Sequence, residues 1–137
     1  MIRWSIVGLV LWAGPSQAMI QCIYYNQMVS AAVDVIQLDA AKIGAADENG
    51  ICGISGHVSR VFAGALQVDD WVDSSAPCDN AQGLDGPTIW TDAAALAQAK
   101  VIELHLDGDS QIAGYGAGLV LLDATTETPA WKPVCGE

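Results

Sequence analysis

The order of apolar and polar positions predicts a chain built mainly of β-strands. The first predicted strand spans residues 33–38, where the apolar positions do not alternate cleanly and so indicate burial on both faces. A second predicted strand spans residues 51–62. It follows Asn49 and Gly50, a pair that favours a hairpin between apolar runs because both residues tolerate positive φ. The chain is therefore expected to reverse direction just before the second strand.

The second predicted strand carries a charge on its apolar face. Ile54, Val58 and Phe62 share this face by the two-residue period of a strand, and Arg60 falls on the same face. Because a charged side chain does not fit a buried stripe, Arg60 predicts a β-bulge in this strand.

Turn and helix signals divide the middle of the chain. Residues 64–70 predict a turn, and a third strand begins at Trp71 and ends before Cys78. Residues 79–88 contain Asn, Asp, Gly and Pro and predict a loop. Residues 93–100 are the best helix-forming run, with Thr91 as the expected N-cap.

Strict alternation returns over residues 101–106 and predicts a half-buried strand. This alternation places Glu103 and His105 together on its outward face, where we expect a solvated pair. A hairpin at 107–108 leads to a partner strand over about 111–122. The total is five strands with one short helix between the third and the fourth, which is the content of a small β-barrel.

The length of the chain limits it to one domain, and its N-terminal segment predicts that this domain is exported. The sequence has 137 residues, 52% of them hydrophobic, which is enough to bury a core. Residues 1–18 have the basic start, short apolar run and Ser-Gln-Ala ending of a signal peptide, so we expect residues 19–137 to form the domain. The apolar run is too short to span a membrane. The predicted location is the periplasm or the extracellular space.

The charge of the chain excludes two classes of partner. Sixteen acidic residues face five basic ones, for a net charge of -11. Nucleic acids and anionic membrane surfaces are bound through clustered Lys and Arg, which this chain lacks. An exported protein or another envelope component is the expected partner, and no membrane span remains after signal removal.

Four cysteines predict two disulfide bonds. All of them lie in the exported portion, where an oxidising compartment favours pairing. Zinc sites bring cysteines together in close Cys-x-x-Cys pairs, whereas the spacings here are far longer, so no metal site is expected. Three pairings remain open for these residues: Cys22, Cys52, Cys78 and Cys135.

One segment resembles a known family. Residues 56–72, GHVSRVFAGALQVDDWV, followed by Cys78, resemble a hairpin of the netrin-like and tissue-inhibitor-of-metalloproteinase-like modules over residues 56–78. Asp69 stands where that pattern usually has Gly. The resemblance implies an OB-like five-stranded barrel. By analogy it also implies that Cys22 pairs with Cys78 and Cys52 with Cys135.

The activity of those inhibitors is the alternative function that the resemblance offers, directed at an exported hydrolase. In the inhibitors, a cysteine at the mature N-terminus chelates the zinc of the protease and a second cysteine follows two residues later. Here Cys22 lies behind three residues of the predicted mature chain, and Tyr24 takes the place of the second cysteine. Zinc chelation through Cys22 is therefore not expected.

Catalytic motifs are incomplete in this sequence. Ser55 and His57 share one strand face, but a nucleophile elbow needs Gly-x-Ser-x-Gly before a helix, and this segment continues as a strand. The two histidines, His57 and His105, together with scattered acids, support a second alternative, a metal-binding or enzymatic domain.

Aromatic residues supply the candidate binding surface, because such side chains dominate interface hot spots. The sequence thus predicts a mainly β, disulfide-stabilised, OB-like barrel with one short helix. Its expected function is that of a small acidic binding or structural protein, non-enzymatic and without a cofactor. The residues of the candidate surface are Trp71, Trp90, Tyr24 and Tyr25.

Overall fold

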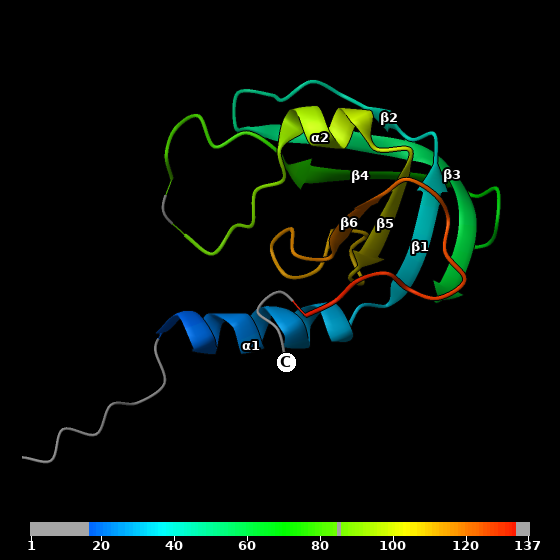
Figure 1. The fold of residues 1–137 in the computed structure, drawn as a ribbon, viewed down its shortest axis with the longest axis horizontal. Helices are drawn as coiled ribbons and strands as arrows, with labels where there is room; N and C mark the ends of the chain where they lie inside the picture. Colours follow the sequence, from blue (N-terminus) through cyan, green and yellow to red (C-terminus); the bar gives the residue numbers. More distant parts are fainter. Residues whose placement is uncertain (1–16, 85, 134–137) are drawn as a thin grey trace, which may run out of the picture.

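A computed structural model describes residues 17–84 and 86–133, and it is mainly β (Figure 1). One antiparallel sheet contains all six strands, and two helices complete the fold. The elements in chain order are α1 (Gln17–Ser30), β1 (Asp34–Asp39), β2 (Lys42–Ile43), β3 (Ile51–Ala63), β4 (Trp71–Pro77), α2 (Ala93–Gln98), β5 (Val101–Leu106) and β6 (Leu119–Leu122).

The long strand β3 organises the sheet. Its path runs β2-β3-β1-β5-β6, and β4 also pairs with β3. The short β2 continues the edge that β1 begins, since Leu38 pairs with Val58 and Lys42 pairs with Ser55. Within the described residues β4 and β6 pair with one strand each, so the sheet is not closed and the predicted barrel is not confirmed.

Strand β3 is strongly curved (Figure 1). Arg60 pairs with Gln37, and the register shifts on both sides of this pair, between Val35 and Ile36 and between Gln37 and Leu38. The expected β-bulge is thus confirmed. Because bulges increase twist and bend a strand, β3 turns from its pairing with β4 to its pairing with β1.

The main core lies on the inner face of the sheet, and a buried disulfide bond between Cys52 and Cys78 forms part of it. Cys52 bonds Cys78, with a Cα–Cα distance of 5.8 Å. Antiparallel pairing explains the bond, because Cys52 lies opposite Ala76, two residues before Cys78. The pairings taken from the family resemblance, Cys22 with Cys78 and Cys52 with Cys135, are therefore wrong. The fully buried side chains of this core include Ile36, Leu38, Ile54, Val58, Leu96, Ile102, Leu104 and Leu106.

Helix α1 was not expected from the sequence, and it builds a second, smaller core. Tyr25 and Val29 lie one helical turn apart and are buried against Ala113 and Ala117. Cys22 is disulfide-bonded, and Cys135 lies outside the described residues. Of the predicted signal peptide, residues 1–16 also lie outside the described residues.

No helix in the described part of the chain is both long and apolar enough to cross a membrane.

The loops and the strand boundaries differ from expectation at two places. Asp92, not Thr91, caps α2, since its carboxylate accepts the amide of Ala95 at 2.9 Å. The strand expected over 111–122 is regular only in β6, because turns with positive φ at Gly114 and Gly116 interrupt its first half. The expected loop at 79–88 is confirmed in its described residues, as is the chain reversal at Gly50.

Replacing Asp92 by alanine should lower the free energy of unfolding by about 1 kcal/mol, because the Ala95 amide loses its acceptor. Urea unfolding followed by circular dichroism measures the change. Asp92→Asn, which keeps a side-chain oxygen, is the control and should retain most of the stability. An equal loss in both variants would contradict the capping role.

Candidate functional site

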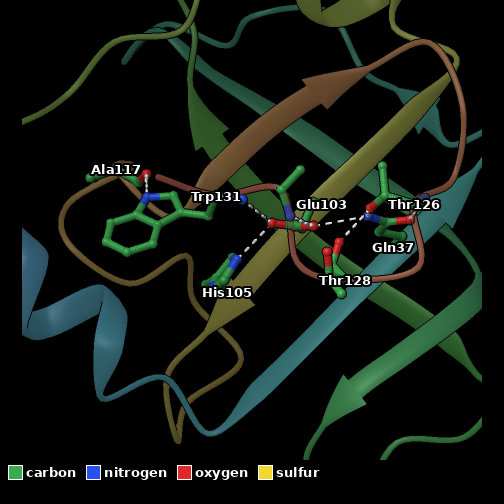
Figure 2. Close-up of polar contacts among 8 residues, drawn as sticks. Gln37, Glu103, His105, Ala117, Thr126, Thr128 and Trp131 are labelled. Atoms are coloured by element: carbon green, nitrogen blue, oxygen red, sulfur yellow. Dashed lines mark hydrogen bonds and ion pairs between the residues drawn. The ribbon is translucent and has the colours of Figure 1, made fainter. Parts of the chain in front are cut away.

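A buried, hydrogen-bonded polar cluster lies on the outer face of β1 and β5. Gln37 pairs with Glu103 across the two strands, and His105 follows two residues later on the same face. We expected Glu103 and His105 to be solvated, but they are only 0% and 5% exposed, so this prediction is wrong. Residues 124–131, here called the C-terminal strap, cover them (Figure 2).

The Glu103 carboxylate is the centre of this cluster. Its Oε1 accepts the Gln37 amide and the backbone N–H of Ala130, both at 2.8 Å. Its Oε2 accepts the backbone N–H of Trp131 and faces Nε2 of His105, again at 2.8 Å. Four donors therefore surround one buried carboxylate, and two of them belong to the backbone of the strap.

Gln37 holds the other end of the strap. Its Nε2 donates to Oγ1 of Thr126 at 2.7 Å, and its Oε1 accepts the Thr126 amide at 3.0 Å. The hydroxyl of Thr126 donates a hydrogen bond to the carbonyl of Thr128, and Arg60 donates one to the Thr126 carbonyl. Arg60, which lies at the β-bulge of β3, therefore also holds the strap in place.

Trp131 joins the strap to the second core. Its ring lies 5.7 Å from the His105 ring, and its Nε1 donates to the carbonyl of Ala117 at 3.2 Å. It also packs against the cluster of Tyr25 and Val29 from α1. The strap and α1 therefore lie side by side, as Figure 1 shows.

Hydrogen bonding controls the charge of Glu103. Burial is the largest influence and favours the neutral acid, but the bonds from His105, Ala130, Gln37 and Trp131 together outweigh it and lower the pKa to about 2. Glu103 is therefore a stable anion whose lone pairs are all engaged. Such a group holds a segment in place and has no free position for proton transfer to a substrate.

Acid should weaken the fold through this carboxylate. The pKa of Glu103 is about 2 when folded and 4.5 as its ordinary value, so its contribution is complete above pH 4.5 and is lost as the pH falls through 2. A shift of this size corresponds to about 3 kcal/mol of folding free energy. Urea unfolding at several pH values between 2 and 5 measures it. A Glu103→Gln variant should show a correspondingly flatter dependence, and equal slopes would contradict the assignment.

The structure does not join Ser55 and His57 by a hydrogen bond. Nδ1 of His57 lies 3.0 Å from the carbonyl of Asp69, and its ring contacts Trp71 edge-on at 5.1 Å. Ser55 lies within β3, which continues as a strand where a nucleophile elbow would require a helix.

Metal ligands are not assembled either. His57 lies in the middle of β3, where the pairing with β4 ends, and His105 lies under the strap, so the structure does not bring them together. The described residues contain no group of three or more His, Cys, Asp or Glu side chains that could hold a metal. Since a disulfide-bonded Cys22 has no thiolate, it is also not a zinc ligand in this form.

The four aromatic residues of the candidate surface are spread over the molecule. Trp71 is 58% exposed at the start of β4, whereas half-buried Trp90 lies near Gly50, beside the other end of that strand. Tyr24 is exposed on α1, but Tyr25 is buried and donates its hydroxyl proton to the carbonyl of Pro87. They do not form one surface.

The outer edge of β4 was missed by the sequence reasoning. The backbone N–H of Val58 donates to the carbonyl of Asp70, and the N–H of Cys78 donates to the carbonyl of Gly50. In an antiparallel pair, residues that exchange hydrogen bonds alternate with residues that do not, so the even-numbered residues of β3 and β4 bond to each other. The odd-numbered backbone groups of β4 therefore point away from β3. No described residue bonds the N–H or C=O of Asp73 or Ser75, and both residues are exposed. Which backbone groups of β4 point outward depends on which residues of β3 and β4 face each other, and the sequence alone does not show that pairing.

A hollow of about 170 Å³ adjoins this edge. It separates β4 from the 111–116 segment, and its lining is both apolar and polar: Ile51, Ser75, Pro77, Thr88, Gln111, Ile112, Tyr115 and Gly116.

The chain matches no family model, no curated protein and no solved structure. The geometry alone therefore supports a functional proposal.

Proposed function

We propose that this chain is an exported, acidic and non-enzymatic binding module whose partner is a protein. The open edge of β4 carries the proposal, because the outward backbone groups of Asp73 and Ser75 are unpaired in the described chain and exposed Trp71 lies at its start. Unpaired strand edges pair readily with another chain. The buried polar side chains Gln37 and Glu103, in contrast, are engaged in holding the C-terminal strap.

The strand order supports an OB-like architecture for this module. Counting β2 as a continuation of β1, the neighbours run β4-β3-β1-β5-β6, and α2 lies between the third and fourth strands. An OB-fold is a partly open five-stranded barrel that binds ligands on the face of its second and third strands. Those strands correspond to β3 and β4 here. The edge of β4 and its hollow therefore lie where such a module would receive a ligand.

Site-specific photocrosslinking tests the proposal. A benzophenone amino acid replaces Trp71, and in a separate variant it replaces Tyr24, which is equally exposed but lies on α1. In the compartment of the native protein, position 71 should crosslink to a specific protein and position 24 should not. Crosslinks to no protein at position 71 would overturn the binding proposal.

A further inference from the structure

We propose that the outer edge of β4 binds an extended, basic peptide segment as an added β-strand. The inference rests on the proposed binding function and names the chemistry of the partner. Trp71, Asp73 and Ser75 alternate along this edge with their backbone groups directed outward. An added strand would pair with Asp73 and Ser75 in succession, since both residues leave a donor and an acceptor unused within the described chain.

The hollow beside the edge favours a strand with one protruding side chain. It begins at Ser75 and Pro77, and across it lie Gln111 and Tyr115. Its 170 Å³ suits one side chain of a bound strand, because alternate residues of an added strand point to one face. Near Pro77 the edge ends, as the Pro77 carbonyl already accepts the Thr91 amide.

Charge decides which extended segment fits. Asp69, Asp70 and Asp73 lie on β4 or directly before it. Asp107 and Asp109 belong to the hairpin whose Ser110 carbonyl accepts the Ser74 hydroxyl at 3.1 Å, so they approach the same strand. Residues 64–77 and 107–116 contain no Lys or Arg. A basic strand is therefore attracted, and an acidic one is repelled.

The same charge argues against a second copy of this chain as the occupant. If two β4 edges paired antiparallel with the two-fold axis at Asp73, Asp73 of one copy would face Asp73 of the other, and with the axis at Ser74, the middle of β4, the two carboxylates would still lie on one face at diagonal positions. Like charges at facing positions destabilise a pair of strands, and a charged residue on an edge is a common protection against self-pairing. The charge of Asp73 thus disfavours pairing of this edge with a second copy and favours pairing with a basic strand.

The experiment uses a synthetic peptide, acetyl-KTKVKTK-amide, and its acidic counterpart, acetyl-ETEVETE-amide. Binding to the full disulfide-bonded protein is measured by calorimetry, and amide hydrogen exchange is followed at each residue by NMR. The basic peptide should bind and slow exchange at Asp73 and Ser75 at least tenfold. Its affinity should fall as salt is added. The acidic peptide should bind at least tenfold more weakly.

Two variants separate backbone pairing from general attraction. Ser75→Pro removes the outward N–H without removing a bond to β3, and it should weaken binding of the basic peptide at least tenfold. Ser75→Ala keeps the N–H and should stay within twofold of the wild type. Unchanged circular dichroism in both variants verifies that the fold persists. Asp73→Lys tests the charge independently and should also weaken binding at least tenfold.

Each contrary result is distinct. No slowing of exchange at Asp73 and Ser75, or equal binding to Ser75→Pro and Ser75→Ala, would overturn the inference. Concentration-dependent dimers that protect Asp73 and Ser75 without peptide would also overturn it, in favour of a second copy. If position 71 still crosslinks to a protein, binding is retained and only the added-strand mode fails.

Discussion

Replacing Glu103 by glutamine should lower the free energy of unfolding by about 3 kcal/mol near neutral pH. In the wild type each carboxylate oxygen accepts two hydrogen bonds, including those from Ala130 and Trp131 of the C-terminal strap. A glutamine removes the charge and directs an NH₂ group at N–H donors. The buried donors then lose their acceptor, which costs more than the loss of an exposed hydrogen bond.

Urea unfolding measures this change, and Glu127→Gln is its matched control. Glu127 lies on the same strap but is exposed, so its replacement should alter stability by less than about 0.5 kcal/mol. Hydrogen exchange should show where the damage lies, with faster exchange of the Ala130 and Trp131 amides in Glu103→Gln alone. Similar stabilities of the two variants would show that the strap is not anchored by this carboxylate.

Removal of the Cys52–Cys78 disulfide should cost about 3.5 kcal/mol. The bond joins residues 26 apart in the sequence, and a loop of this length restricts the unfolded chain by about that amount. Both cysteines are replaced by alanine so that neither leaves a free thiol. Urea unfolding without reductant provides the free energy and the m-value of the variant.

The m-value separates the lost cross-link from lost packing. A chain without the bond exposes more surface on unfolding, so the m-value should rise as the stability falls. Deleting two buried sulfur atoms alone would lower stability at a constant m-value. That second pattern would contradict the cross-link as the source of the stability.

Local signals predicted β1, β3, β4 and β5 because the turns beside them are encoded locally, but they missed the short β2, so the sheet has six strands where five were expected. Gly50 has a φ of +78°, and a Cβ at this position would lie 1.9 Å from the carbonyl oxygen of Asp79, so the Asn-Gly signal reflects a real steric need. Arg60 predicted the bulge in β3 for a similar reason, since its charge could not share an apolar stripe.

Contacts between distant segments could not be predicted in this way. Alternation placed Glu103 and His105 outward correctly, but it did not show that residues about 27 positions later cover them. Helix α1 was overlooked although Tyr25 and Val29 have helical spacing, because the run Gln17–Ser30 has no clear apolar stripe and no charged residue in its first or last turn. The candidate site at β4 depends on which backbone groups of this strand point away from β3, and the pattern of apolar and polar side chains does not reveal this.

The position of the C-terminal strap has a consequence for how the molecule is made. Ribosomes synthesise the chain from its N-terminus, so β1 to β6 are complete before Ala130 and Trp131 exist. Until those last residues arrive, the Glu103 carboxylate lacks two of its four donors and favours hydration over burial. This face of the sheet is therefore completed only once residues 130 and 131 are in place. A chain that stops or is cleaved before Ala130 should therefore leave the Glu103 side of the sheet uncovered.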